Sequence, residues 1–155
     1  MIHYHGGPLG RANQSHEFFR GRHSLISFQH RQEMEVMAEV SHSFILDNGS
    51  EEENDSEIHN WPLGQIGVPV WHLNESIDRL VRLTSEWPRI ALGSTSGMTP
   101  GSKRYWVRIA QVMDSICDRA GKPTCKLHGL RMLNPEIFRY IPLASADSTN
   151  AVMWS

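Results

Sequence analysis

The sequence predicts an α/β fold in which a parallel sheet forms a barrel-like (β/α) arrangement of the TIM type, incomplete and with about seven strands. Short apolar segments alternate with amphipathic or capped helical segments, which is typical of βα units and a parallel sheet. The chain has 155 residues, whereas an eight-stranded βα barrel typically needs about 250. We therefore expect a single domain over residues 1–155. An open doubly wound sheet is the alternative.

Three strands and two helices are expected before the middle of the chain. The alternating or apolar segments 1–5, 23–28 and 43–46 predict strands, and segments 13–20 and 32–40 predict helices. The third strand is followed directly by Asp47, Asn48, Gly49 and Ser50. The acidic run EEENDSE then predicts a solvated loop or a helix start.

Four further strands are expected in the second half, at residues 67–73, 89–92, 125–128 and 143–146. Asn74 is expected to cap a helix whose inward side chains are Ile77, Leu80, Val81 and Leu83. A longer helix is expected to begin at Thr99-Pro100 and to end at Gly121. Its apolar face is predicted to contain Tyr105, Ile109, Val112, Met113 and Ile116. Asn134 and Pro135 predict the start of a short last helix.

The composition restricts the classes of function. Hydrophobic residues make up 39% and charged residues 21%, as in an ordinary globular domain, and the net charge is −2. That charge argues against strong non-specific nucleic-acid binding, although a local basic patch stays open. No apolar run of membrane length and no leader sequence is visible, so we expect a cytoplasmic protein. Cys117 and Cys125 are expected to be reduced thiols.

Polar residues at the strand ends are the candidate site. Right-handed βα crossovers place every carboxyl end of a parallel sheet on one face. His5, Asp47, His72, Gly93, His128 and Asp147 would collect there. Two carboxylates, Asp47 and Asp147, can divide nucleophile and acid/base roles. Gly93 has no side chain, so a ligand can approach its backbone closely, and His128-Gly129 offers another backbone contact. Together these residues suit a ligand that is a flat polar ring. A lone Asp at such a position also commonly caps a turn.

Four segments resemble the tRNA-guanine transglycosylase family, and they follow one another along the chain in the same order as in that family. The last of the four, LHGLRMLNPEIFRYIPLASADSTN (127–150), resembles the end of that barrel, where a glycine-containing strand, a Pro-Glu helix and an apolar strand lead to the nucleophilic Asp. RIALGSTSG (89–97) resembles the base-binding strand, and VPVWHLNESIDRL (68–80) resembles the strand and helix before it. FILDNGS (44–50) resembles the strand that ends in the second Asp. The phage branch, related to the deazapurine DNA-modification transglycosylases, is the most similar.

The resemblance implies a pentosyltransferase that exchanges guanine or a 7-deazaguanine in phage DNA or tRNA through a covalent Asp–sugar intermediate. Asp147 would be the nucleophile and Asp47 the acid/base and base-reading carboxylate. The substrate-binding residues would be Trp71 or His72, Gly93, Ser94, His128 and Gly129. The partners would be the nucleic acid and the base, in the host cytoplasm if the protein is phage-encoded, with no membrane. A homodimer stays open.

Two departures from the family pattern are visible. The zinc-binding cysteine cluster of the family is absent, so we expect no metal and no cofactor. The family's fourth strand, which carries a further base-binding Asp, is missing after Ser50, and its usual D-S-G-G-F motif is reduced to D-N-G-S at residues 47–50. A βα unit has about 30 residues, so the loss of one unit is consistent with the shortness of the chain.

Two other functions stay open. His3 and His5 form an H-x-H motif on the first strand. With His72, His128 and Asp147 at other strand ends, they suit a metal-dependent hydrolase. Alternatively, the chain is a non-catalytic remnant that binds a base or nucleic acid and keeps only the pocket.

Overall fold

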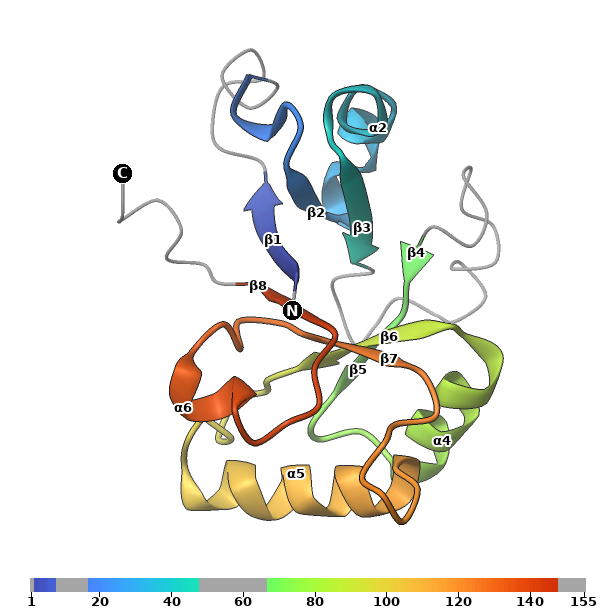
Figure 1. The fold of residues 1–155 in the computed structure, drawn as a ribbon, viewed down its shortest axis with the longest axis vertical. Helices are drawn as coiled ribbons and strands as arrows, with labels where there is room; N and C mark the ends of the chain where they lie inside the picture. The colour runs from blue at the N-terminus through green and yellow to red at the C-terminus, as the bar shows by residue number, and fades with distance from the viewer. Residues whose placement is uncertain (1, 8–16, 48–66, 148–155) are drawn as a thin grey trace.

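The computed structural model describes residues 2–7, 17–47 and 67–147, and it contains an all-parallel, curled sheet with helices packed on it (Figure 1). The strands are β1 (Ile2–Gly7), β2 (His23–Ser27), β3 (Ser43–Asp47), β4 (Gly67–Val68), β5 (Val70–His72), β6 (Arg89–Gly93), β7 (Lys126–Gly129) and β8 (Ser145–Asp147). The helices are the 3₁₀ helix η1 (Phe28–Glu33), α2 (Met34–Val40), α4 (Ile77–Glu86), α5 (Lys103–Ile116) and α6 (Pro135–Phe138).

Pro69 connects the two end strands of the curled sheet. The strand order is β4-β3-β2-β1-β8-β7-β6-β5, so β4 and β5 lie at its two ends although only Pro69 separates them in the chain. Proline has no N–H to donate, which interrupts the strand, but its carbonyl accepts a hydrogen bond from the Ala91 amide at 2.9 Å. The two ends of the sheet thus meet at one residue. The predicted fold class, an incomplete barrel-like parallel α/β fold, is confirmed.

β1 changes partner halfway along its length. Ile2, His3 and Tyr4 pair with β8, whereas the next three residues, 5–7, pair with β2. The stretch 67–72 behaves in the same way, because β4 pairs with β3 and β5 pairs with β6. The sheet is therefore two strongly staggered halves that are joined through β1 and through Pro69.

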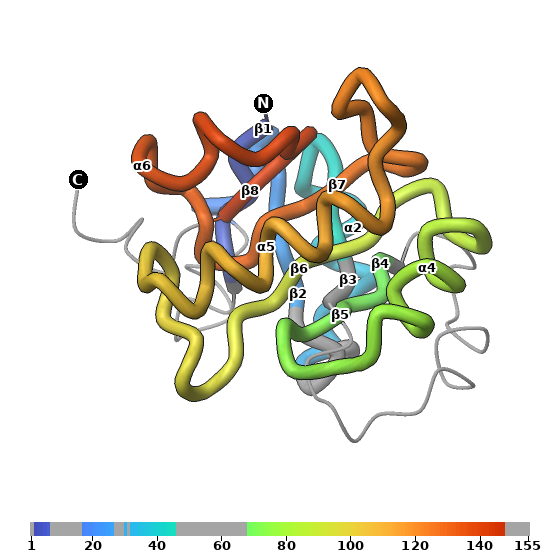
Figure 2. Tube along the Cα trace, turned by 90° about the horizontal axis from the view of Figure 1, so that it is seen from below, coloured from blue at the N-terminus to red at the C-terminus, as the bar shows by residue number. Residues whose placement is uncertain are grey.

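The two faces of the sheet bury different clusters. α4, α5 and α6 lie on the side of β5–β8 that faces away from β1–β3 (Figure 1). Seen from below, α5 crosses in front of the sheet and α4 lies beside it (Figure 2). The outer cluster fills the space between strands and helices and includes Trp71, Ile90, Leu92, Leu127 and Tyr105. The inner cluster lies inside the curl and consists of Tyr4, Leu25, Ile45, Val68, Val70 and Ala91.

The start of α4 differs from the prediction. Ser76, not Asn74, is the N-cap, and its hydroxyl accepts a hydrogen bond from the Arg79 amide at 3.3 Å. A turn closed by the Glu75 amide and the His72 carbonyl at 2.9 Å comes first and delays the helix. Val81 was expected to face inward, but it is 44% exposed.

α5 is shorter than predicted at both ends. Gly101 has a φ of 87°, which excludes it from a helix, so the helix begins after Ser102 and not at Thr99. At the other end Cys117 is extended and forms a bridge to Pro123, so the helix ends before Gly121.

The remaining boundaries follow the prediction closely. Asn134 caps α6 as expected, accepting from the Glu136 amide at 3.0 Å. The predicted helix 32–40 begins as 3₁₀ and becomes α-helical at Met34. Most of the predicted helix 13–20, the acidic run 51–57 and the place of the missing fourth strand lie outside the described residues. Within the described ranges, no helix has the length and apolar character needed to cross a membrane.

Candidate functional site

The carboxyl ends of the strands form one rim, because every pair in the sheet is parallel. Five of the sequence-predicted residues are at or next to those ends. The last residues of β3, β5, β6, β7 and β8 are Asp47, His72, Gly93, Gly129 and Asp147. The prediction that Asp47 and Asp147 lie at the same end of a parallel sheet is confirmed. The structure describes only the backbone of Asp47, so a shared cavity stays a prediction.

Asp147 is held by a buried histidine. Asp147 is 5% exposed and His128 is completely buried. Asp147 Oδ2 lies 3.3 Å from His128 Nε2, and His128 Nδ1 lies 2.9 Å from the Ser145 hydroxyl. An ionised carboxylate only accepts hydrogen bonds, so with Asp147 ionised Nε2 donates to it and Nδ1 accepts from Ser145. The three side chains thus satisfy one another, as buried polar groups must.

The loop after β7 completes the surroundings of Asp147. The Arg131 amide donates to Asp147 Oδ1 at 2.6 Å, and the Leu133 amide donates to the Asp147 carbonyl at 2.9 Å. Arg131 has a φ of 59°, the only positive value among the described non-glycine residues. That left-handed backbone is unfavourable for residues with a Cβ. The strain is the cost of aiming this amide at the carboxylate.

A second group of polar side chains lies inside the curl, between His128 and the beginnings of the strands. The Tyr4 ring meets His128 edge-on, with centroids 5.5 Å apart. The Tyr4 hydroxyl lies 3.2 Å from the Ser43 hydroxyl and accepts from Arg89 Nη1 at 3.1 Å. His23 Nδ1 lies 2.7 Å from the same serine oxygen. Ser43, His23 and Arg89 all begin strands, so this group closes the end of the curl opposite to Asp147.

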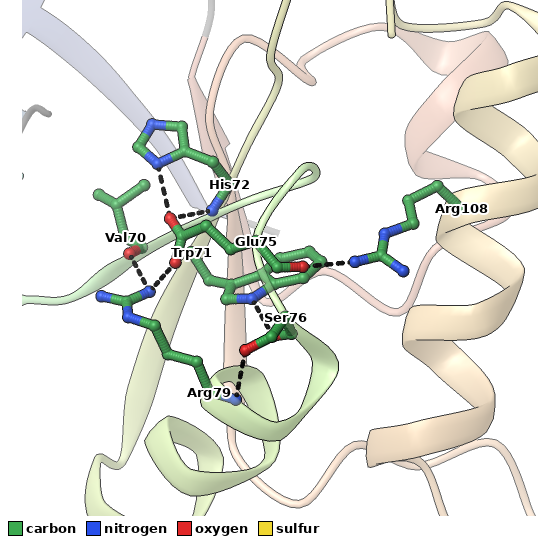
Figure 3. A network of polar contacts seen from close by, with 7 residues as sticks. All are labelled: Val70, Trp71, His72, Glu75, Ser76, Arg79 and Arg108. Carbon is green, nitrogen blue, oxygen red and sulfur yellow. Dashed lines mark hydrogen bonds and ion pairs between the residues drawn. The ribbon is translucent and has the colours of Figure 1, made fainter. Parts of the chain in front are cut away.

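His72 occupies another part of the rim and is held by Glu75 (Figure 3). Glu75 Oε1 accepts the His72 amide at 3.0 Å and lies 3.1 Å from His72 Nδ1. Glu75 Oε2 forms an ion pair with Arg79, whose Nη1 also donates to the Val70 carbonyl at 3.1 Å. Burial alone would raise the pKa of Glu75. The hydrogen bonds from His72 and the charge of Arg79 outweigh it, and the pKa is lowered.

Gly93 supports the imidazole of His72. A Cβ at Gly93 would lie 2.8 Å from His72 Cδ2 and 3.2 Å from both His72 Nε2 and a Val70 methyl. These separations leave no room for a larger residue, so glycine allows the imidazole to lie against the end of β6. Ser94 follows Gly93 directly and is partly exposed.

Two predicted base-contacting residues face away from the inside of the curl. Trp71 is fully buried in the outer cluster, and its indole N–H donates to the Ser76 carbonyl at 2.9 Å. Of the neighbours Trp71 and His72, the structure thus brings only His72 to the rim. A Cβ at Gly129 would lie 2.8 Å from both Met132 and Leu143. Gly129 therefore permits close packing under the loop after β7.

The H-x-H motif lies on the outer side of β1. Successive side chains alternate between the faces of a strand, and Tyr4 faces the inner cluster. The rings of His3 and His5 are 4.3 Å apart, and His5 meets Phe18, which packs on the outer cluster. Burial lowers the pKa of both histidines, and the charge of Asp147 partly opposes this for His3. Within the described ranges, no group of three or more His, Cys, Asp or Glu side chains is arranged to hold a metal ion.

Two surface hollows lie away from the rim. The larger, of about 580 Å³, lies between α5 and α6 with their flanking residues, and it is lined by Gly101, Trp106, Ile109, Ala110, Met113, Glu136 and Tyr140. The smaller, of about 400 Å³, lies where β7 and β8 begin and includes Cys125, Lys126 and Ala144. Neither contains a residue of the predicted site.

Sequence reasoning missed four residues of this site. Ser145 could have been found, because it stands two positions before Asp147 and a strand places such residues on one face. Glu75 could have been suspected from its position three residues after His72. Tyr4 and Arg131 reach the site only through the curl of the sheet and the φ of one loop residue, and the sequence carries no signal for either.

Comparison with known proteins adds no relative: no family model, no curated protein and no solved structure matches this chain.

Proposed function

We propose that the carboxyl rim binds a purine-like base, and that the protein is a transglycosylase that exchanges this base in DNA or tRNA. The observation that carries the proposal is the carboxylate of Asp147, held in one orientation by His128 and the Arg131 amide. Parallel pairing puts it at the same rim as Asp47 and His72. Active sites of parallel βα barrels lie at this end of the strands.

The proposed reaction has two displacements at the sugar. In the first, Asp147 Oδ bonds to C1′ while the bond between C1′ and the base nitrogen breaks, and the departing base takes a proton from an acid. In the second, the nitrogen of the incoming base attacks C1′, the bond between C1′ and Asp147 breaks, and the proton of the incoming base goes to the same group. Asp47 is the proposed acid and base, since a carboxyl group can serve in both steps.

The neighbouring residues have supporting roles in this proposal. His128 and the Arg131 amide keep Asp147 in place, so less conformational freedom is lost when the nucleophile attacks. His72 contacts the edge of the base, and Gly93 and Ser94 contact it through the backbone.

A second candidate is a non-catalytic protein that binds the base or the nucleic acid. The burial of Asp147 favours it, because this side chain is 7% exposed and both of its oxygens already have partners. A nucleophile must reach C1′ of the sugar, so catalysis requires Asp147 to be more accessible than it is in this structure.

The substitution Asp147→Asn tests the nucleophile. The amide keeps the shape of the side chain but cannot form the bond to C1′, so we expect base exchange to be abolished and base binding to change little. The assay incubates the protein with guanine-containing DNA or tRNA and a labelled 7-deazaguanine. Incorporation and binding are followed separately. Asp114→Asn, an exposed carboxylate on α5, is the matched control and should behave as the unsubstituted protein.

The outcomes separate the candidates. Exchange that survives in Asp147→Asn refutes Asp147 as nucleophile. If the unsubstituted protein binds the base without exchanging it, the non-catalytic candidate is correct. If it binds neither base nor nucleic acid, both candidates fail.

A further inference from the structure

Glu75 fixes the position of the hydrogen on the His72 ring. Its Oε1 atom lies 3.1 Å from His72 Nδ1 and also accepts the His72 amide at 3.0 Å. The lowered pKa of Glu75 means that the carboxylate is ionised at neutral pH. An ionised carboxylate cannot donate, so Nδ1 must carry the hydrogen. In a neutral imidazole the other nitrogen, Nε2, then has a lone pair and accepts.

The carboxylate of Glu75 is itself held from the opposite side (Figure 3). Arg79 pairs with Oε2, one turn into α4. Arg108 on α5 donates to the Glu75 carbonyl and, at 2.8 Å, to the Leu73 carbonyl. The turn between β5 and α4 is thus tied to two helices, and Glu75 has little freedom to release His72.

His72 Nε2 has no partner within the described ranges. The hydrogen bonds of His72 run through its amide, its carbonyl and Nδ1. Nε2 lies beside Gly93, at the ends of β5 and β6. The imidazole thus has one nitrogen satisfied and the other without a partner, at a rim residue whose side chain is 16% exposed, which is the arrangement that a ligand could complete.

We propose that Glu75 is a positioning residue that presents His72 Nε2 as a hydrogen-bond acceptor to an N–H group on the edge of a flat heterocycle. The ligand class rests on the proposed function. A base with an N–H at this place gains a hydrogen bond. A base with a lone pair there leaves two acceptors facing each other, which is costly in a desolvated site. Guanine and 7-deazaguanine carry several N–H donors and belong to the accepted class.

The first measurement needs no ligand. Nitrogen-15 NMR of the histidine rings distinguishes the two neutral tautomers. We expect His72 in the unsubstituted protein to carry its hydrogen on Nδ1. In Glu75→Ala, Nδ1 loses its acceptor, so a larger fraction of the His72 rings should carry the hydrogen on Nε2. A hydrogen on Nε2 in the unsubstituted protein, or an unchanged tautomer in Glu75→Ala, overturns the role of Glu75.

The second measurement is guanine binding by calorimetry. A single neutral hydrogen bond contributes a factor of roughly 3 to 10 in affinity, so Glu75→Ala should weaken binding by about that factor. The same substitution in a His72→Phe background should have no further effect, because Glu75 acts through His72. Glu86→Ala, at an exposed ion pair with Arg82 on the same helix, is the control and should leave binding unchanged.

The two measurements distinguish a wrong role for Glu75 from a wrong proposed function. If Glu75→Ala weakens guanine binding equally in the presence and absence of His72, Glu75 has a different role and the inference is wrong. If the unsubstituted protein binds no guanine, the proposed function and the ligand class of this inference fail together. In that case the NMR result alone decides whether Glu75 sets the tautomer.

Discussion

The outer face of this sheet buries a larger apolar cluster than the inner face, and the inner face also buries polar side chains. The outer cluster joins nineteen buried residues of the described chain, whereas the inner cluster joins six. The inner side also contains buried polar residues, namely His128, Ser145 and Asp147. Burying polar groups costs free energy unless they pair with one another. The comparison indicates that the outer face supplies most of the stability, and that the inner face gives up some of it to hold polar groups in place.

Neighbouring residues on β5 test this comparison with the largest expected effect. Trp71 belongs to the outer cluster and His72 to the rim. Trp71→Ala should lower the free energy of unfolding by about 3–5 kcal/mol, because it leaves a large cavity. His72→Ala should cost about 1 kcal/mol, since it removes one side-chain hydrogen bond and leaves Glu75 paired with Arg79. Urea unfolding followed by circular dichroism measures both. Equal losses would contradict the division between the faces.

Alanine substitutions at two glycines test the same difference between the faces, with a smaller expected loss of stability. A Cβ at Gly93 would crowd His72, and a Cβ at Gly129 would crowd Met132 and Leu143. Each alanine substitution should destabilise the fold by about 1–3 kcal/mol, as overpacking usually does. Only Gly93→Ala should also shift the ring resonances of His72 in NMR spectra. The division would fail if Gly129→Ala shifted those resonances as strongly as Gly93→Ala.

The smallest predicted effect is a pH dependence from Glu75. Its pKa in the folded protein lies below the ordinary value of 4.5, so ionised Glu75 stabilises the fold. This contribution is complete above pH 4.5 and is lost as the pH falls through the folded pKa. Glu75→Gln lacks it, so the variant should lose less stability than the unsubstituted protein when the pH falls below 4.5. Thermal unfolding at several pH values measures this, and parallel curves for the two proteins would contradict it.

The fold could be predicted because its signals are local. Each expected strand in the described ranges is found, since apolar runs bounded by Gly, Pro, Asn or Ser carry that information within a few residues. Asp47, His72, Gly93 and Asp147 were placed at one rim by a single argument, that parallel strands share the direction of their ends.

The details of the site were harder to predict because they depend on contacts between distant residues. Whether Trp71 or His72 faces the rim depends on which residue of the strand faces inward, and Pro69 interrupts that strand. The turn before α4 brings Glu75 back to His72 and moves the helix start to Ser76, so the cap predicted at Asn74 was wrong. The left-handed conformation of Arg131 has no signal in the sequence, since the residue is not a glycine.

The pairing of β1 with β8 has a consequence for the order of folding. Ile2 pairs with Ser145, so this edge of β1 finds its neighbour only in a segment that is very distant in the sequence. During synthesis from the N-terminus, the edge of β1 that faces β8 stays unpaired until the ribosome has released Ser145–Asp147. Unpaired strand edges are prone to associate with other chains. The pairing of β1 with β8 is therefore a long-range event, and until it forms this edge of β1 is open to association with other chains.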